Sequence, residues 1–367
     1  MELLFNTDAA FTRWIVRSGT LREAFVVVDV GVQGGVNERW HLLGDHLVVH
    51  GFDAVEEVIG ALSQGDARTP SIAYHALAIG NEDGDREFFV RRDDSTSSSF
   101  YRSSDPRLEP RTVPIRKLDT LLRTGVIPKA DFLKVDVEGF ESDVFHGAAE
   151  LLAAGVLGVE FETNLMTSVT YPSTHFVAIQ DILLQHGMFV CDLNFNRVLR
   201  SSYQEARARR KLPPLPSAGA AGKPSSFNVL FCRDIAAERG GDAYYAKVPP
   251  RPSVDQILKT MSIFELYGLS DMALDTAVAC ADELGQRLDV ERAVDLLCRQ
   301  HSVRQSEDVD RINKLGQQIN DLKDQRAQLY GKCLALEEAL SQMQSSTAWR
   351  LTAPLRTVVH RFRNPAR

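Results

Sequence analysis

The chain has 367 residues, of which 44% are hydrophobic and 25% are charged. These proportions are typical of a folded globular protein, and the length predicts two folded units with appendages. No apolar run approaches the roughly 20 residues that a membrane-spanning helix needs. The first residues also lack the basic and apolar regions of a signal peptide, so the sequence predicts a cytoplasmic protein.

The net charge of -7 is unevenly distributed along the chain. Residues 347–367 contain five arginines and no acidic residue, which suits contact with an anionic surface. The acidic remainder disfavours a nucleic-acid partner, because a duplex would require a basic face. The five cysteines form no C-x-x-C pair, which argues against a zinc site and a disulfide framework.

A buried strand and a glycine-containing turn open the first informative stretch. The apolar run at residues 25–28 is typical of a strand buried on both faces of a parallel sheet. The run leads to Asp29 and then to Gly31 and Gly35, which can take positive φ and let the backbone approach a ligand closely. A second apolar run ends on Phe52 and Asp53. A carboxylate about 20 residues beyond such a turn is where α/β nucleotide folds hold a ribose diol.

The position of the first acid distinguishes between nucleotide cofactors. The pattern is D-x-G-x-x-x-G, from Asp29 to Gly35, rather than the G-x-G-x-x-G of dinucleotide enzymes. A carboxylate at Asp29 would repel a pyrophosphate but would suit the ammonium group of a methionine moiety. S-adenosylmethionine therefore fits better than NAD. The alternative is an ordinary strand-turn-helix in which the aspartate only caps the helix.

Strands and helices alternate through residue 235, which predicts an α/β fold with a Rossmann-like sheet. The sheet is expected to be mostly parallel, with an antiparallel end strand. We expect helices within 1–24 and over 55–62, 141–152 and 176–186, and strands over 25–28, 46–52, 71–80, 86–90, 132–139, 157–162, 188–193 and 227–232.

Charged residues alternate at the end of the expected strand over 132–139. Lys134, Asp136 and Glu138 are costly to bury without a function, and ligands of open α/β sheets bind at the carboxyl ends of strands. We assign these three residues to the acceptor side of a catalytic site, with Glu160 or His175 as candidate bases. Carboxylates near Asp136 could hold a divalent metal, but no His/Asp spacing requires one, so we predict no metal site.

The C-terminal third changes character at a Pro-rich linker, residues 241–252. Residues 253–301 predict a small helical module without a chemical cluster, which suits a spacer or a docking element. Residues 305–346 predict a coiled coil, because nine of the ten a and d positions over 312–343 are apolar, Arg326 being the exception. This coiled coil predicts a homo-oligomer. The basic tail, 347–367, suits a membrane interface or a disordered terminus.

Five short motifs stand together in residues 25 to about 235: Asp29-x-Gly31-x-x-x-Gly35, Phe52-Asp53, Ala76-Leu77-Ala78-Ile79-Gly80, Leu118-Asp119-Thr120-Leu121 and Lys134-Val135-Asp136-Val137-Glu138-Gly139-Phe140-Glu141. In these motifs the chain resembles the FkbM-type methyltransferases, which are S-adenosylmethionine-dependent O-methyltransferases. The family usually has Ala and Asn where this chain has Val32 and Gln33, and Glu-Pro where it has Asp53-Ala54.

The resemblance implies a methyltransferase domain over residues 1–240 and a set of cofactor contacts. Gly31 and Gly35 would allow close approach of the cofactor, and Asp29 would bind its ammonium group. The Phe52-Asp53 pair would place a carboxylate on the ribose, and Ala76 would lie beside the adenine.

The tail separately resembles the S-x-S-W-R-L-T-x-P-L-R ending of bacterial enzymes of surface-polysaccharide assembly, including glycosyltransferases. Together the two resemblances imply methylation of a sugar hydroxyl on a bacterial surface glycan or glycolipid precursor, with a peripheral contact to the membrane or to a glycosyltransferase through the tail. The alternative is a non-catalytic methyltransferase-like adaptor that organises polysaccharide-assembly enzymes through its coiled coil. The altered Val32-Gln33 turn favours the adaptor.

Overall fold

A computed structural model describes residues 6–65, 71–91, 98–102, 105–164, 176–198, 201–210, 223–240 and 250–299, together with Lys332. Residues 1–301 form one compact unit, and residues 302–367 are assigned to a second. The predicted coiled coil and basic tail lie outside the described residues, apart from Lys332. No helix among the described residues is long and apolar enough to cross a bilayer.

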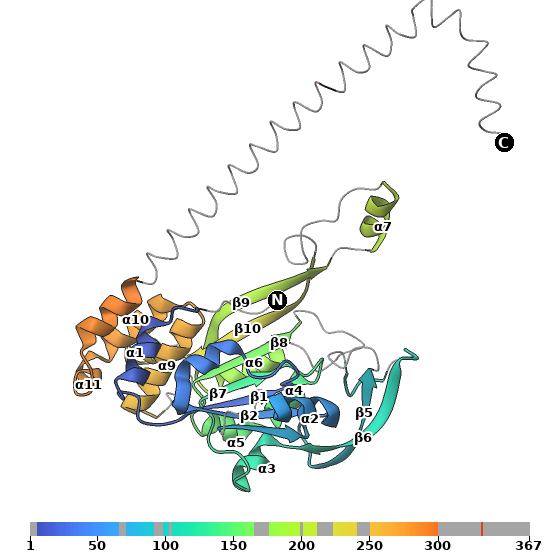
Figure 1. The fold of residues 1–367 in the computed structure, drawn as a ribbon, viewed down its shortest axis with the longest axis horizontal. Coiled ribbons are helices and arrows are strands. Elements are labelled where there is room, and N and C mark those ends of the chain that lie inside the picture. Colours follow the sequence, from blue (N-terminus) through green and yellow to red (C-terminus); the bar gives the residue numbers. More distant parts are fainter. Residues whose placement is uncertain are drawn as a thin grey trace, which may run out of the picture. The chain divides into compact units, whose positions relative to one another are not determined.

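A mostly parallel seven-stranded sheet forms the centre of the described fold (Figure 1). Its order is β3-β2-β1-β7-β8-β10-β9, in which β10 runs opposite to the other six strands. The strand order reverses between β1 and β7, which is where ligands of α/β sheets bind. The strands are β1 (Phe25–Val30), β2 (Leu47–Asp53), β3 (Ile72–Ala76), β7 (Phe132–Val135), β8 (Gly158–Thr163), β9 (Met188–Val198) and β10 (Lys223–Arg233).

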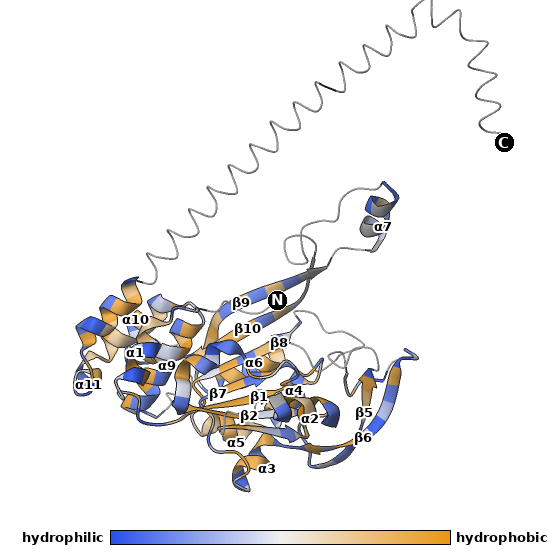
Figure 2. Cartoon of the chain, in the orientation of Figure 1, coloured by the Kyte–Doolittle hydropathy of each residue, from blue (hydrophilic) through white to orange (hydrophobic). Residues whose placement is uncertain are grey.

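Two hydrophobic cores lie on the two faces of this sheet, because successive strand side chains point to opposite sides. In β1, Phe25 and Val27 belong to one core, whereas Val26 and Val28 belong to the other. Figure 2 shows hydrophobic residues concentrated in the sheet and in the helices packed against it. The first core contains residues of α1 (Ala10–Arg17), η1 (Glu38–His46), α8 (Ile235–Gly240), α9 (Val254–Leu266), α10 (Ser270–Ala279) and α11 (Ala281–Leu284); the second contains residues of α3 (Leu118–Arg123), α4 (Glu141–His146), α5 (Ala149–Ala153) and α6 (Phe176–Leu184).

The predicted α/β fold class is confirmed, and three details differ from the prediction. The expected strand 71–80 is divided at Leu77, because β4 (Ala78–Ile79) leaves the main sheet and pairs with β6 (Leu108–Arg116). A small second sheet results, in which β6 also pairs antiparallel with β5 (Gly84–Arg91). The antiparallel strand β10 lies one position inside the edge, because its hairpin partner β9 occupies the end. The expected helix 141–152 is two helices separated at Gly147, where a Cβ would lie 1.9 Å from the Gly80 carbonyl oxygen.

Two further helices complete the described fold. Helix α2 (Glu56–Gly65) follows β2 and contacts β3, as a crossover between parallel strands should. Helix α7 (Ser201–Arg209) lies in the sequence between the hairpin strands β9 and β10. Residues 290–299 are also helical.

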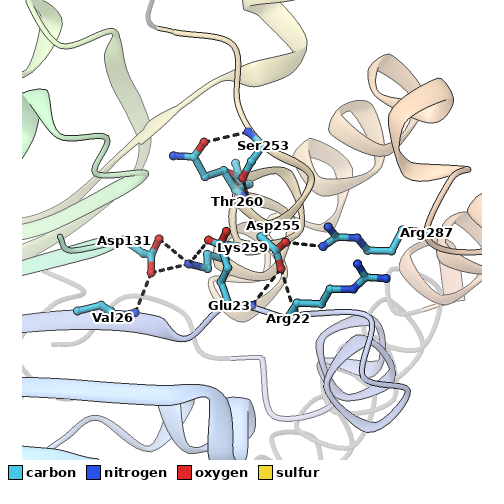
Figure 3. Close-up of polar contacts among 10 residues, drawn as sticks. Arg22, Glu23, Val26, Asp131, Ser253, Asp255, Lys259, Thr260 and Arg287 are labelled. Atoms are coloured by element: carbon cyan, nitrogen blue, oxygen red, sulfur yellow. Dashed lines mark hydrogen bonds and ion pairs between the residues drawn. The ribbon is translucent and has the colours of Figure 1, made fainter. Parts of the chain in front are cut away.

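Helix α9 is anchored to the sheet by buried ionic contacts (Figure 3). The Lys259 ammonium lies 3.0 Å from both carboxylate oxygens of Asp131, and one of these oxygens accepts a 2.8 Å hydrogen bond from the Val26 backbone amide. Asp255 accepts hydrogen bonds from the backbone amides of Arg22 and Glu23. The capping box at Ser253 begins this helix. The helical residues of the described segment 253–299 therefore share the core of the sheet.

The first prediction concerns this buried pair. Lys259→Met should lower the free energy of unfolding by about 3–5 kcal/mol, because it leaves the Asp131 carboxylate buried without its cation. Urea denaturation followed by circular dichroism measures the change. Arg299→Met is the matched control, since Arg299 pairs with Asp295 at 3.5 Å while both side chains are mostly exposed, and it should change little. Equal losses of unfolding free energy in the two variants would contradict a buried ion pair between Lys259 and Asp131.

Candidate active site

A pocket of about 560 Å³ lies at the carboxyl ends of β1, β2 and β7. Its position is the switch point of the strand order, where an α/β sheet leaves a crevice. The pocket is lined by the turn after β1, the tip of β2, the loop after β7, β4 and parts of the second sheet. Of the predicted site residues, it brings together Asp29, Gly31, Gly35, Phe52, Asp53, Lys134, Asp136 and Glu138.

The turn after β1 needs glycine at Gly31 for two reasons. Its φ is +89°, and a Cβ there would lie 1.8 Å from the carbonyl oxygen of Asp136. The backbone amides of Gly31 and Val32 donate to the Phe52 carbonyl at 2.8 and 3.1 Å, which holds the turn over the tip of β2. Gly35 also has positive φ, at +80°. The turn thus keeps its close backbone approach despite the unusual Val32-Gln33 sequence.

Charged side chains form a row across three adjacent strands. Asp29 on β1 is in register with Lys134 on β7, which is in register with Glu160 on β8. The Lys134 ammonium lies 3.5 Å from a carboxylate oxygen of Asp29 and 3.5 Å from one of Asp136. The row places a cation between carboxylates, which is the arrangement that a buried charge needs.

Burial and pairing shift the protonation of this row. Burial lowers the pKa of Lys134, but the carboxylates of Asp29, Asp136 and Glu160 outweigh it and raise that pKa above its ordinary value. Burial raises the pKa of Asp29, although Lys134 opposes the shift. Lys134 is therefore a permanent cation and cannot act as a base.

The Asp29 carboxylate is buried where β1 meets the pocket. Asp29 is 2% exposed, and its Oδ1 lies 3.5 Å from the Lys134 ammonium. A buried carboxylate is stabilised by nearby positive charge. Because Asp29 also lines the pocket, the site suits the ammonium group of a methionine moiety.

The tip of β2 carries a second carboxylate, Asp53, in the pocket lining. Asp53 Oδ1 accepts a 2.7 Å hydrogen bond from the Val55 amide, and burial raises the pKa of Asp53 to about 6. Phe52 is fully buried, and its ring stacks on that of His75 at 4.6 Å. Near neutral pH the Asp53 carboxylate is mostly ionised and can accept hydrogen bonds from a diol.

The loop after β7 differs from the sequence prediction. The strand ends at Val135 rather than at Gly139, so Lys134, Asp136 and Glu138 do not alternate along one strand. Glu138 has φ of +50°, which is rare for a residue with a side chain. The cause is Glu141, whose Oε1 accepts hydrogen bonds from the amides of Val137 and Gly139 at 3.3 and 3.0 Å. These contacts turn the loop around a buried carboxylate.

Three predicted residues are not among the described residues that line the pocket. Glu160 is 7% exposed, and its Oε2 accepts a 2.5 Å hydrogen bond from the Tyr267 hydroxyl at the end of α9. Ala76 is exposed on β3, and its neighbours Leu77 and Ala78 line the pocket instead. His175 lies outside the described residues.

The sequence prediction also missed residues that line the pocket. Glu38 comes from the segment after the glycine turn, and Phe88, Ser98 and Phe100 come from β5 and the loop that follows it. No motif marks these positions. Ser98 and Phe100 lie in a serine-rich stretch, and such a composition is typical of a surface loop. Glu141 lay in the longest predicted motif, but only its contacts with the loop amides reveal its role.

Comparison with known protein families agrees with this geometry. Residues 29–188 match the methyltransferase FkbM domain. The matched range begins at the acid of the glycine turn, contains every described pocket residue and ends at the start of β9. No curated protein matches the chain.

Solved structures similar to the chain include several methyltransferases. An FkbM methyltransferase from Methylobacillus flagellatus KT is 17% identical, with a TM-score of 0.30, and the match covers 49% of this chain and 44% of that chain. This chain thus spans less than half of that protein. Magnesium protoporphyrin IX methyltransferase from Synechocystis PCC 6803, solved with bound SAM, is 11% identical, with a TM-score of 0.31 and coverage of 61% and 76%. A methyltransferase-like structure from Listeria monocytogenes is 11% identical, with a TM-score of 0.30 and coverage of 61% and 99%.

The FkbM domain match supports S-adenosylmethionine as the cofactor, as the sequence predicted. The residues of the pocket fit this molecule: a carboxylate at Asp29, a second carboxylate at Asp53 and a turn at Gly31 that leaves room for close approach.

The second prediction tests the close contact at Gly31. Gly31→Ala should abolish saturable binding of S-adenosylhomocysteine or prevent folding, because the new Cβ would overlap the Asp136 carbonyl at a positive φ. Thermal denaturation separates the two outcomes. Gly60→Ala on α2 is the control, since a Cβ there meets nothing within 4 Å and should slightly stabilise the helix. A Gly31→Ala variant with unchanged stability and binding would contradict the structure.

The third prediction concerns Glu141, where burial raises the pKa to about 8. A carboxyl with a higher pKa when folded is penalised once it ionises, so its penalty grows between about pH 4.5 and 8. Relative to Glu141→Gln, the wild-type free energy of unfolding should fall over this range by at most about 1.4 kcal/mol per pH unit. Urea denaturation at several pH values measures the difference. If the free energy of unfolding changed with pH in the same way for both proteins, the raised pKa of Glu141 would be refuted.

Proposed function

We propose that the chain is an S-adenosylmethionine-dependent O-methyltransferase that acts on a sugar hydroxyl of a bacterial surface glycan or glycolipid precursor. The observation that carries the methyltransferase proposal is the Asp29 carboxylate in the lining of a pocket within the matched FkbM domain. An acidic pocket at this position suits a cofactor with a positive sulfur and an ammonium group.

The cofactor end of the pocket is formed by β1 and β2. Asp29 would hold the ammonium group, Asp53 the ribose hydroxyls, and the backbone at Gly31 and Gly35 would lie against the ligand. When bound, the cofactor supplies a methyl group on a positively charged sulfur, which an acceptor hydroxyl can attack once it is correctly placed.

The acceptor end is formed by the loop after β7. The Asp136 side chain is 38% exposed and faces the pocket, so its carboxylate can take the proton from an acceptor hydroxyl. Lys134 keeps its proton and orients Asp136 through the ion pair at 3.5 Å. Glu138, on the same loop, is the second carboxylate at this end. Asp136 replaces the sequence candidate Glu160 in this role, since Tyr267 occupies the Glu160 carboxylate.

The proposals of a sugar acceptor and of a cellular setting are supported by the amino-acid sequence alone. The resemblance of the tail to enzymes of surface-polysaccharide assembly supports a glycan acceptor, and the coiled coil over 312–343 supports a homo-oligomer. Both segments lie almost entirely outside the described residues. A cytoplasmic protein whose tail contacts the membrane or a glycosyltransferase stays a prediction.

The fourth prediction separates this enzyme from a non-catalytic adaptor, which has no need of a cofactor pocket. The full chain should bind S-adenosylhomocysteine saturably in calorimetric titration, and Asp53→Ala should weaken binding by at least about tenfold through loss of the diol contacts. Affinity should fall about tenfold from pH 7 to pH 5, because Asp53 has a pKa of about 6 and must be ionised to accept both hydroxyls.

Asp53→Asn is the matched control for the pH dependence. This variant cannot ionise at position 53, so its affinity should vary much less over the same range. Absence of binding by folded wild-type protein would overturn the enzyme proposal and favour the adaptor.

A further inference from the structure

The wall of the pocket that faces away from the main sheet is aromatic. Phe88 on β5 and Phe100 in the loop after it both line the pocket, with ring centroids 5.0 Å apart in an edge-to-face arrangement. The Phe100 ring also lies 4.6 Å from that of Phe140, which follows the β7 loop. An aromatic face can bind the C–H face of a ligand ring without requiring charge.

This aromatic wall is held in place from two sides. The Arg86 guanidinium lies 5.0 Å from the Phe100 ring centroid and 4.9 Å from that of Phe140, and it pairs with Glu82 at 2.9 Å. The Ser99 hydroxyl donates a 2.9 Å hydrogen bond to the Glu138 carbonyl. The wall is therefore attached to the loop that carries the acceptor-side carboxylates.

Most charged side chains that line the pocket are acidic. Its described lining contains five carboxylates, from Asp29, Glu38, Asp53, Asp136 and Glu138, and one cation, Lys134. Asp29 would face the positive groups of the cofactor. The acceptor end then has two carboxylates, Asp136 and Glu138, and one cation, Lys134. An anionic group placed there would be repelled.

We infer that this pocket selects an uncharged carbohydrate acceptor that stacks on Phe100 and Phe88, and that it excludes acceptors with a phosphate near the methylated hydroxyl. Pyranose rings have the two properties that the site requires, an apolar C–H face and hydroxyl groups that can donate to carboxylates. Methylation would then follow the reaction that transfers the sugar out of its phosphate-activated form. This inference rests on the proposed methyltransferase function and identifies the acceptor class of the same site.

The test uses the full chain with radiolabelled S-adenosylmethionine and matched acceptor pairs. Each pair is a methyl glycoside of a common hexose or deoxyhexose and the corresponding sugar 1-phosphate. At least one glycoside should accept a methyl group, with kcat/KM at least about tenfold above its 1-phosphate, as expected for repulsion worth about 1.4 kcal/mol or more. Glu138→Gln should reduce this discrimination.

Variants of the aromatic wall test the stacking contact separately. Phe100→Leu keeps an apolar side chain but removes the ring, so it should raise KM for the glycoside about tenfold while S-adenosylhomocysteine affinity stays unchanged. Phe100→Tyr keeps an aromatic ring, so its KM for the glycoside should stay close to the wild-type value. Tyr203→Leu, on α7, removes an exposed aromatic outside the pocket lining and is the control.

The outcomes distinguish this inference from the function on which it rests. Preference for the 1-phosphates, no transfer to any glycoside by protein that binds S-adenosylhomocysteine, or an unchanged KM in Phe100→Leu would overturn the carbohydrate acceptor. Failure to bind S-adenosylhomocysteine would instead overturn the methyltransferase proposal.

Discussion

The Lys134 ammonium, held between the carboxylates of Asp29 and Asp136, is the interaction on which the site depends. A lysine at the centre of a sheet is costly to bury, and its neighbours make the burial tolerable only if they stay ionised. The same contacts bring the ends of β1 and β7 together where the strand order reverses. One cluster of charges therefore joins the ends of these two strands and places Asp29 and Asp136 in the lining of the pocket.

The C-terminal helices supply part of the support for that cluster. Tyr267, at the end of α9, donates to Glu160 at the far end of the charged row, and the Arg39 guanidinium lies 4.0 Å from the Tyr267 ring centroid. Glu265 on the same helix accepts hydrogen bonds from the backbone amides of Phe11 and Thr12 at 2.8 and 2.7 Å, at the first turn of α1. Helix α9 thus connects the N-terminal segment to the central sheet, which is a more integral role than a spacer would have.

The sequence predicts the parts of the site that local chemistry determines. The run before Asp29 is apolar because β1 is buried on both faces, and Gly31 is marked because only glycine tolerates both its φ and its contact with Asp136. Alternation misled where a side chain determines the backbone path: Glu141 accepts hydrogen bonds from the amides of Val137 and Gly139, and the chain turns after β7 ends at Val135. Glu160 lies on a strand, as the sequence predicted. Its carboxylate accepts a hydrogen bond from Tyr267, 107 residues away, and Glu160 is not part of the pocket lining. No local signal encodes such partners.

The two ends of the pocket have different structural origins, and this difference bears on specificity. The cofactor end is built from the tips of β1 and β2, whose backbone geometry is fixed by the main sheet. The aromatic wall comes from the second sheet, which leaves the main sheet at Leu77 and contacts it again through Ser99 and Phe140. Under the proposed function, changes in the second sheet would therefore alter acceptor choice without disturbing cofactor binding. Ser99 limits that freedom, because its hydrogen bond to the strained Glu138 backbone couples the position of the wall to the position of the acceptor-side carboxylate.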